Sequence, residues 1–170
     1  ACNDAEICKI QMLFNQAKIT TGHRKVTVAA KNHKQETGHT SAAIELEDGT
    51  IICGHSSELL GCSAALLLNV TKHLGDIDHN LKLIPQSMIE PIQYTKVNYL
   101  GGHNPRLHTD EVLVALSVLS ENDENCRVAL QQLPKLRGCQ AHCTVMLSDV
   151  DQRIFKKLGV NITCEPVLKK

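Results

Sequence analysis

The spacing of hydrophobic residues changes several times along this chain, and each change marks a predicted element. Apolar residues recur every three or four positions in seven segments, as in amphipathic helices: 3–18, 23–37, 58–74, 87–100, 109–119, 123–133 and 148–158. Alternating or short apolar runs predict five strands: 41–47, 50–53, 81–84, 139–147 and 160–164. Strands that alternate with helices after an initial hairpin are typical of a layered α/β domain.

The clearest local signal is the pair of strands joined at Asp48–Gly49. An Asp-Gly pair between two apolar runs favours a two-residue hairpin with a type I′ turn, in which both central residues have positive φ. We therefore predict an α/β fold with three α-β-α layers. Its mixed five-stranded sheet would carry the antiparallel hairpin at one edge and parallel crossovers elsewhere.

Residue types at the segment ends predict where helices begin. Ser56 or Ser57 is expected to cap the long apolar helix 58–74, and Thr109 the helix that follows residue 108. Asn122 or Asp123 precedes the next helix. Ser148 opens the last one in a sequence that resembles a capping box, with Asp151 in place of Glu.

Composition excludes several classes of function. The 170 residues carry 18 basic and 18 acidic side chains, two Phe, two Tyr and no Trp. A neutral chain with so few aromatic rings lacks the charge and the stacking surfaces of a nucleic-acid-binding protein. No apolar run reaches the length of about 18 residues that a membrane span needs. The first residues lack the pattern of a signal peptide, so we expect a cytoplasmic protein.

Eight cysteines and nine histidines are the unusual feature of the composition. The cysteines are scattered without a CxxC pair, and most occupy apolar positions, which indicates small buried side chains in a reducing compartment. Cys139, His142 and Cys143 lie close in sequence, but on a strand His142 points to the face opposite the two cysteines. A structural zinc site there would need a third cysteine from elsewhere, and no zinc is expected.

Three segments carry residues that suit an anionic ligand. His55, Ser56 and Ser57 lead from a predicted strand into a helix start, where amide groups attract anions. Arg106 lies with two histidines, His103 and His108, in a loop ahead of the next helix. His142 would point from a strand end into the crevice where open α/β sheets bind ligands. Each segment also has a purely structural interpretation as a cap, a connection or a core position.

Several blocks of the chain, in order, resemble one family of uncharacterised bacterial proteins, the domain of unknown function DUF1846. The blocks are SAAIELEDGTI (41–51), SAALLLNVTK (63–72), DEVLVALS (110–117), LRGCQAH (136–142) and LGVNIT (158–163). The resemblance covers residues 24–166. It implies a longer protein with a P-loop-like nucleotide-binding front half, a small helical part and this C-terminal domain.

On that resemblance, residues 1–22 are the end of the preceding helical part and residues 23–170 are the α/β domain. The chain contains no G-x-x-x-x-G-K-[ST] motif. The expected role is therefore that of an accessory or pocket-forming domain, whose partner is its own nucleotide-binding domain. No cofactor is implied, and self-association stays open.

The order of elements also resembles the cytidine-deaminase fold. Active deaminases carry a Cys- or His-Ala-Glu motif at the start of the buried helix and a Pro-Cys-x-x-Cys motif after the next strand. The corresponding stretches here are 61–65 and 85–89, in which only Cys62 matches a ligand. Deaminase chemistry is therefore not expected. The alternative is an enzyme that acts on an anionic small molecule through His142 with Ser56, Ser57 and Arg106.

Overall fold

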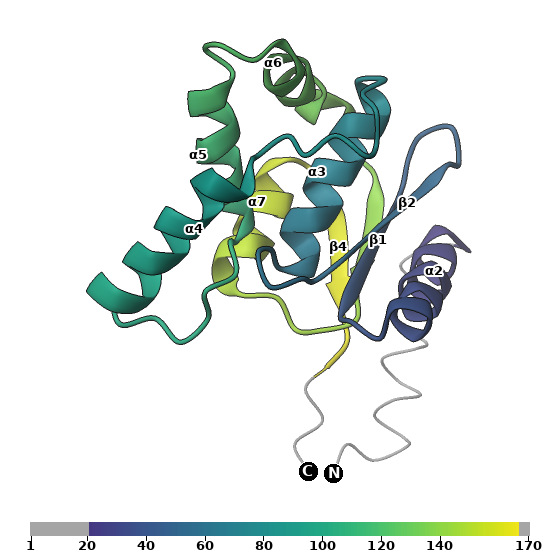
Figure 1. The fold of residues 1–170 in the computed structure, drawn as a ribbon. Helices are drawn as coiled ribbons and strands as arrows, with labels where there is room; N and C mark the ends of the chain where they lie inside the picture. Colours follow the sequence, from purple (N-terminus) through teal and green to yellow (C-terminus); the bar gives the residue numbers. More distant parts are fainter. Residues whose placement is uncertain (1–20, 167–170) are drawn as a thin grey trace.

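The computed structural model describes residues 21–166 and is shown in Figure 1. Its elements in chain order are α2 (Thr21–Thr37), β1 (Ser41–Glu45), β2 (Ile51–His55), α3 (Cys62–Leu74), α4 (Gln86–Tyr94), the π-helix η1 (Thr95–Tyr99), α5 (Thr109–Leu119), α6 (Glu124–Gln131), the 3-10 helix η2 (Leu133–Leu136), β3 (Gln140–Cys143), α7 (Asp149–Lys157) and β4 (Asn161–Cys164). The predicted helix at 3–18 lies outside the described residues.

The strands form one mixed sheet with the order β2-β1-β3-β4. β1 pairs antiparallel with both β2 and β3, and β3 pairs parallel with β4. Helix α2 packs against one face, through Val26, Ala30 and Ala43. Helices α3 and α7 cover the other face (Figure 1), where they bury Ala42, Ala141 and neighbouring side chains. The α/β class, the mixed sheet and the hairpin at its edge are therefore confirmed.

The sheet has four strands within residues 21–166, so the prediction of a fifth strand at 81–84 was wrong. This segment runs irregularly beside a second core, in which Leu83 and Ile84 are buried among helices α3 to α6. The buried Lys72 ammonium donates to the carbonyls of His79 (2.8 Å) and Leu81 (3.1 Å). A short apolar run that ends in proline has the composition of a buried strand. Here, however, the Leu81 carbonyl bonds to the side chain of Lys72 in α3 and not to a neighbouring strand.

The predicted hairpin is present, but its turn is not type I′. Gly49 has φ +85°, whereas Asp48 is not among the positive-φ residues of the described chain. The Gly49 amide donates to the Leu46 carbonyl (2.9 Å), and the Leu46 amide donates to the Thr50 carbonyl (2.8 Å). This pattern fits a type I turn followed by a bulged glycine, the usual form of a slightly longer hairpin loop.

Helix α3 begins at Cys62, four residues later than expected. Ser57 Oγ instead accepts from the amides of Leu59 and Leu60, both at 3.2 Å, and so closes a local turn. Leu60 then forms a parallel β-bridge with Leu107, and Gly61 after it is still extended, so the helix cannot begin before Cys62. A contact between segments far apart in sequence thus overrides the local capping signal.

Other boundaries also differ from the sequence pattern. Strand β3 ends at Cys143, because Thr144 exchanges hydrogen bonds with Ser41 at the start of β1 and the chain then leaves the sheet. His108, not Thr109, is the N-cap residue of α5. The predicted caps Asp123 and Ser148 are confirmed: each side chain accepts an amide from the first turn of α6 or α7. No helix within residues 21–166 has the length and apolarity needed to cross a membrane.

Candidate functional site

A cavity of about 490 Å³ lies where helices α3, α5 and α7 all begin. Its walls come from the residue before β1, the residue after β2, the 104–108 loop, the first turns of α3 and α7, and the segment after β3. The lining residues are Thr40, Ser56, Gly61, Cys62, Ser63, Asn104, Arg106, Leu107, His108, Val145, Met146, Leu147, Ser148 and Asp151. Each helix start brings partly positive amide groups toward this region.

No side chain caps the start of α3. Gly61 is the N-cap residue, and its own amide donates to the Leu107 carbonyl at 3.2 Å. The next residues, Cys62 and Ser63, are 4% and 2% exposed and line the cavity. The Ser63 hydroxyl has no hydrogen-bond partner in the described part of the chain. The hydroxyl oxygen is not among the fully buried polar atoms that lack a partner in the described residues, so it opens onto the cavity, where a ligand can bond to it.

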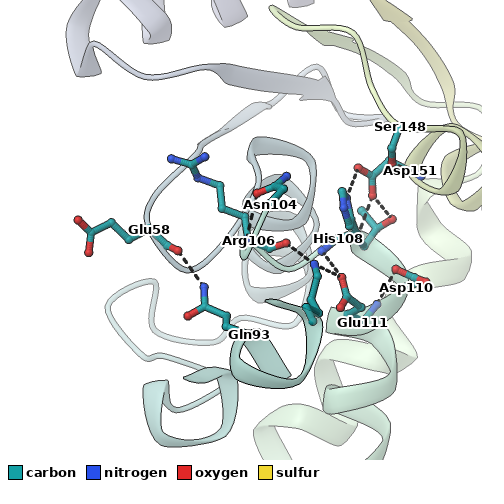
Figure 2. A network of polar contacts seen from close by, with 11 residues as sticks. Glu58, Gln93, Asn104, Arg106, His108, Asp110, Glu111, Ser148 and Asp151 are labelled. Carbon is teal, nitrogen blue, oxygen red and sulfur yellow. Dashed lines mark hydrogen bonds and ion pairs between the residues drawn. The ribbon is translucent and has the colours of Figure 1, made fainter. Parts of the chain in front are cut away.

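Asp151 from α7 holds the start of α5 (Figure 2). Its carboxylate accepts from the Thr109 amide (2.9 Å), the Thr109 hydroxyl (2.6 Å) and His108 Nδ1 (3.2 Å). Burial raises the pKa of Asp151, but the hydrogen bonds from Thr109 and His108 outweigh it, so that the pKa lies below the usual 3.8. The carboxylate is thus ionised and fully engaged with α5.

This arrangement also fixes the orientation of His108. An ionised carboxylate can only accept, so His108 Nδ1 carries the proton and Nε2 is left as an acceptor in the neutral ring. Nε2 has no partner among residues 21–166, and the side chain is 31% exposed beside the cavity. The imidazole therefore has the tautomer and the accessibility of a group that can accept a proton.

Arg106 is among the residues that line the cavity, and its guanidinium group extends away from His108 and Asp151 (Figure 2). Its Nε donates to the Ser57 carbonyl, and its amide donates to Asn104 Oδ1 at 3.1 Å. Lys96 Nζ fixes the loop by donating to the Arg106 carbonyl (2.6 Å) and to Glu111 Oε1 (2.8 Å). Within the described residues, the two terminal amino groups of Arg106 have neither a hydrogen bond nor an ion pair.

The Cys62 thiol lies at the base of the cavity beside a second thiol. A hydrogen bond from Cys143 is the main cause that lowers the pKa of Cys62 below 9.0; the Thr40 hydroxyl and the Ser63 amide also lower it, whereas burial and the Asp151 charge oppose them. Thr40 in turn donates to Ser56 Oγ at 2.8 Å. The polar groups of the cavity thus surround a sulfur atom at a helix start.

The structure brings two of the six predicted ligand residues to this cavity, namely Ser56 and Arg106. Ser57 lies next to it and holds Arg106 through its carbonyl group. His103 is exposed in the same loop, and it is not among the lining residues. The helix start that was predicted at Ser56 and Ser57 is supplied instead by Cys62.

The two remaining candidates, His55 and His142, lie elsewhere. His55 Nδ1 is 3.1 Å from His33 Nε2, and its ring stacks with His39 at 5.9 Å between centroids. His142 is buried in the sheet layer that faces α2. There it contacts Thr163 Oγ1 (2.7 Å) and Glu165 Oε1 (3.0 Å).

Glu165 also forms an ion pair with Lys31 of α2 at 3.1 Å. The cavity, by contrast, adjoins the start of α3, which packs on the opposite face of the sheet. His142 therefore belongs to a polar cluster on the α2 side, and the structure does not bring it together with Ser56 and Arg106.

Sequence reasoning did not select Ser63 or Asp151 as site residues, and it noted His108 only as the second histidine of the loop that carries Arg106. Asp151 was expected only to complete a local capping box, yet its carboxylate bonds to residues 42 and 43 positions earlier. The one local hint was Asp in place of Glu, a side chain shorter than the motif prefers. No group of three or more His, Cys, Asp or Glu side chains within residues 21–166 could hold a metal ion.

Comparison with known families finds a match that covers the folded domain described above. A family model described as "Domain of unknown function DUF1846, C-terminal" matches residues 22–170. The chain belongs to the DUF1846 family. The expectation drawn from the sequence blocks is thereby confirmed.

Similar proteins of the curated set are described as UPF0371 proteins. One from Corynebacterium urealyticum is 48% identical over 164 residues, which is 96% of this chain and 33% of that protein. One from Corynebacterium aurimucosum is 51% identical over 94% of this chain and 32% of its own length. One from Streptococcus pyogenes serotype M5 is 42% identical over 96% of this chain and 33% of its own length. This DUF1846 chain spans about a third of the length of these relatives.

Within this DUF1846 domain, the block at 63–72 has a clear structural purpose. It forms most of α3, whose Ser63 lines the cavity. Asn69 Nδ2 donates to the Cys53 carbonyl of β2 at 3.0 Å, which fixes the helix on the hairpin. Burial lowers the pKa of Lys72, whose ammonium holds the irregular 79–81 backbone. The block therefore both places the helix start and anchors the helix.

Proposed function

We propose that this domain binds the anionic group of a small molecule in the cavity at the start of α3, and that it serves as an accessory domain beside the nucleotide-binding part of a longer protein. The observation that carries the proposal is the convergence of the uncapped helix start, the unpartnered Ser63 hydroxyl and the unpaired end of Arg106.

The chemistry of these groups suits a phosphate or a carboxylate. The first amides of a helix carry partial positive charge, and a phosphate at such a position can accept from several of them at once. Arg106 adds a guanidinium group, which pairs with two oxygens of one anion. Asp151 carries the opposing charge, but its oxygens are already bonded to Thr109 and His108, and the α5 start partly compensates it.

The accessory role is supported by the size of the relatives and by an apolar arm. The relatives are about three times as long as this chain. Helix α4 and π-helix η1 project from the rest of the fold (Figure 1), and they expose Tyr94, Val97, Tyr99 and Leu100. A cluster of large exposed apolar side chains is typical of a contact surface. The proposed partner of this arm is the rest of the longer protein.

A cytidine-deaminase-like topology remains part of the proposal. The strand order, with an antiparallel hairpin at one edge and the parallel pair at the other, supports it. Residues 85–89 begin α4 and follow no strand, so the better counterpart of the second deaminase motif is the 144–148 segment after β3. Neither that segment nor the start of α3 supplies the ligands and the glutamate of a zinc deaminase. Binding is therefore proposed without that chemistry.

Calorimetric titration of the full-length protein with inorganic phosphate and pyrophosphate tests the proposal. Arg106→Gln is expected to weaken binding about tenfold, because it removes a charge-assisted pair. Ser63→Ala should weaken binding by a smaller factor without lowering the unfolding temperature, because the hydroxyl bonds to nothing in the described chain. Arg153→Gln, an exposed arginine of α7 outside the cavity, is the matched control. If Arg106→Gln and Arg153→Gln bound phosphate with equal affinity, the proposed site would be refuted.

The orientation of His108 favours a second candidate function, an enzyme that acts on an anionic small molecule in this cavity. His142, which the sequence suggested for this role, lies on the α2 side, whereas His108 lies at the cavity with Nε2 available. His108→Asn would then abolish turnover of a phosphate ester by the full-length protein and leave phosphate affinity within about twofold. Turnover that survives His108→Asn would exclude this assignment.

A further inference from the structure

Three cysteines from three different elements meet below the cavity. Cys62 is the first residue of α3, Cys143 is the last residue of β3, and Cys164 lies opposite Cys143 in the parallel register of β3 and β4. Cys62 and Cys143 belong to the same buried cluster, against which Cys164 packs. None of the six cysteines in residues 21–166 is in a disulfide.

Cys62 and Cys143 differ in their access to solvent. Cys62 lines the cavity, whereas Cys143 is completely buried beneath it. A small reagent that enters the cavity therefore reaches the sulfur of Cys62 first. Cys62 and Cys143 pack in the same buried cluster, and each thiol shifts the pKa of the other, so a sulfenic acid formed on Cys62 has the Cys143 thiol as a neighbour.

The pKa values of the two thiols also differ, and they too favour Cys62 as the more reactive sulfur. The hydrogen bond from Cys143 lowers the pKa of Cys62, and the helix start acts in the same direction. That shared hydrogen bond and burial raise the pKa of Cys143. Burial also raises the pKa of Cys53, Cys139 and Cys164, and it raises that of Cys126 to about 11. Of the described cysteines, Cys62 therefore carries the largest fraction of thiolate.

We propose that Cys62 is a peroxide-sensitive thiol and that Cys143 is its resolving partner, so that oxidation closes a disulfide between the start of α3 and the end of β3. The site is a covalent modification site that a hydroperoxide of small size can enter from the cavity. It does not depend on anion binding, because the two sulfur atoms and their access define it.

The chemistry proceeds in two balanced steps. The Cys62 thiolate attacks one oxygen of hydrogen peroxide, the S–O bond forms as the O–O bond breaks, and the departing hydroxide takes a proton to become water. Sulfur is oxidised to a sulfenic acid and peroxide is reduced. The Cys143 sulfur then attacks the Cys62 sulfur, the S–S bond forms as the S–O bond breaks, and the hydroxide leaves as water with the Cys143 proton.

Peptide mapping of the oxidised full-length protein tests the assignment. The reduced protein is treated with equimolar hydrogen peroxide, remaining thiols are blocked with N-ethylmaleimide, and the digest is analysed by mass spectrometry. We expect a linked peptide pair that joins Cys62 to Cys143. We also expect Cys62 to be blocked at least about tenfold faster than Cys139 in the untreated protein, since the thiolate is the reactive form.

Two variants separate the roles of the sulfurs. Cys143→Ser should stop the reaction at a Cys62 sulfenic acid, which dimedone traps, whereas Cys164→Ser should leave the Cys62–Cys143 link unchanged. A link from Cys62 to Cys164, or labelling of Cys62 no faster than that of Cys139, would overturn the proposal. The peptide mapping and the labelling comparison are both made on the wild-type chain, so together they decide the question even if a buried Cys143→Ser variant fails to fold.

Discussion

Gly54→Ala is expected to destabilise this domain by at least about 3 kcal/mol, a large part of the stability of a typical domain. Gly54 lies on β2 where α3 crosses the hairpin. An added Cβ would lie 2.4 Å from the Leu66 amide nitrogen and 2.7 Å from its Cα. Both atoms belong to the helix backbone and cannot rotate away. The helix or the hairpin would have to move, and with it one wall of the cavity.

Gly49→Ala is the matched control for this effect. Gly49 lies in the turn of the same hairpin with φ +85°, and a Cβ there meets nothing within 4 Å. Gly49→Ala should lower the free energy of unfolding by about 1–2 kcal/mol, because alanine must adopt a left-handed backbone conformation there. Urea unfolding followed by circular dichroism gives both values. Equal losses for the two variants would show that α3 does not pack on Gly54 as described.

Asp151→Asn is the second change with a large expected effect, a loss of about 2–4 kcal/mol at neutral pH. The carboxylate accepts three hydrogen bonds from His108 and Thr109 and is almost completely buried. Asparagine keeps one acceptor oxygen, loses the charge that faces the start of α5, and brings an amide group that needs a partner of its own. Asp149→Asn, at an exposed position in the same first turn, should cost less than about 1 kcal/mol.

The effect of Asp151→Asn should depend on pH in a defined direction. The folded pKa of Asp151 lies below the ordinary value of 3.8, so the folded state binds fewer protons than the unfolded state. The carboxylate therefore contributes its full stabilisation above about pH 4, and this contribution is lost as the pH falls through the folded pKa. Unfolding measured at neutral pH and at acidic pH should show the wild type and Asp151→Asn converging on acidification. A constant difference would contradict the role of the charge.

The sequence predicted those parts of the fold that neighbouring residues determine. Asp48–Gly49 located the hairpin, and Asp123 and Ser148 each capped the helix that follows them. Two of the failures lie where contacts outside the local motif decide the backbone. The bridge from Leu60 to Leu107 delays α3, and Lys72 holds residues 79–81 away from the sheet.

The candidate site was predictable only in part for the same reason. Arg106 and Ser56 stood out because each lies near a predicted helix start, and both line the cavity. Asp151 and His108 are 43 positions apart, and no local pattern joins them. His142 was correctly placed on a strand, but its face of the sheet packs toward α2. Which face of a strand meets which helix follows from the packing of the whole domain.

The central claim is that the start of α3 forms part of an anion site. An NMR titration of the amide-labelled protein with inorganic phosphate tests it most directly, because the amide resonances report contact residue by residue. We predict that the amides of Cys62 and Ser63 shift most, that Arg106→Gln reduces these shifts, and that Arg153→Gln does not. The claim would be contradicted if saturating phosphate left the amide resonances of Cys62 and Ser63 unshifted. It would also be contradicted if only the resonances of residues outside the cavity shifted.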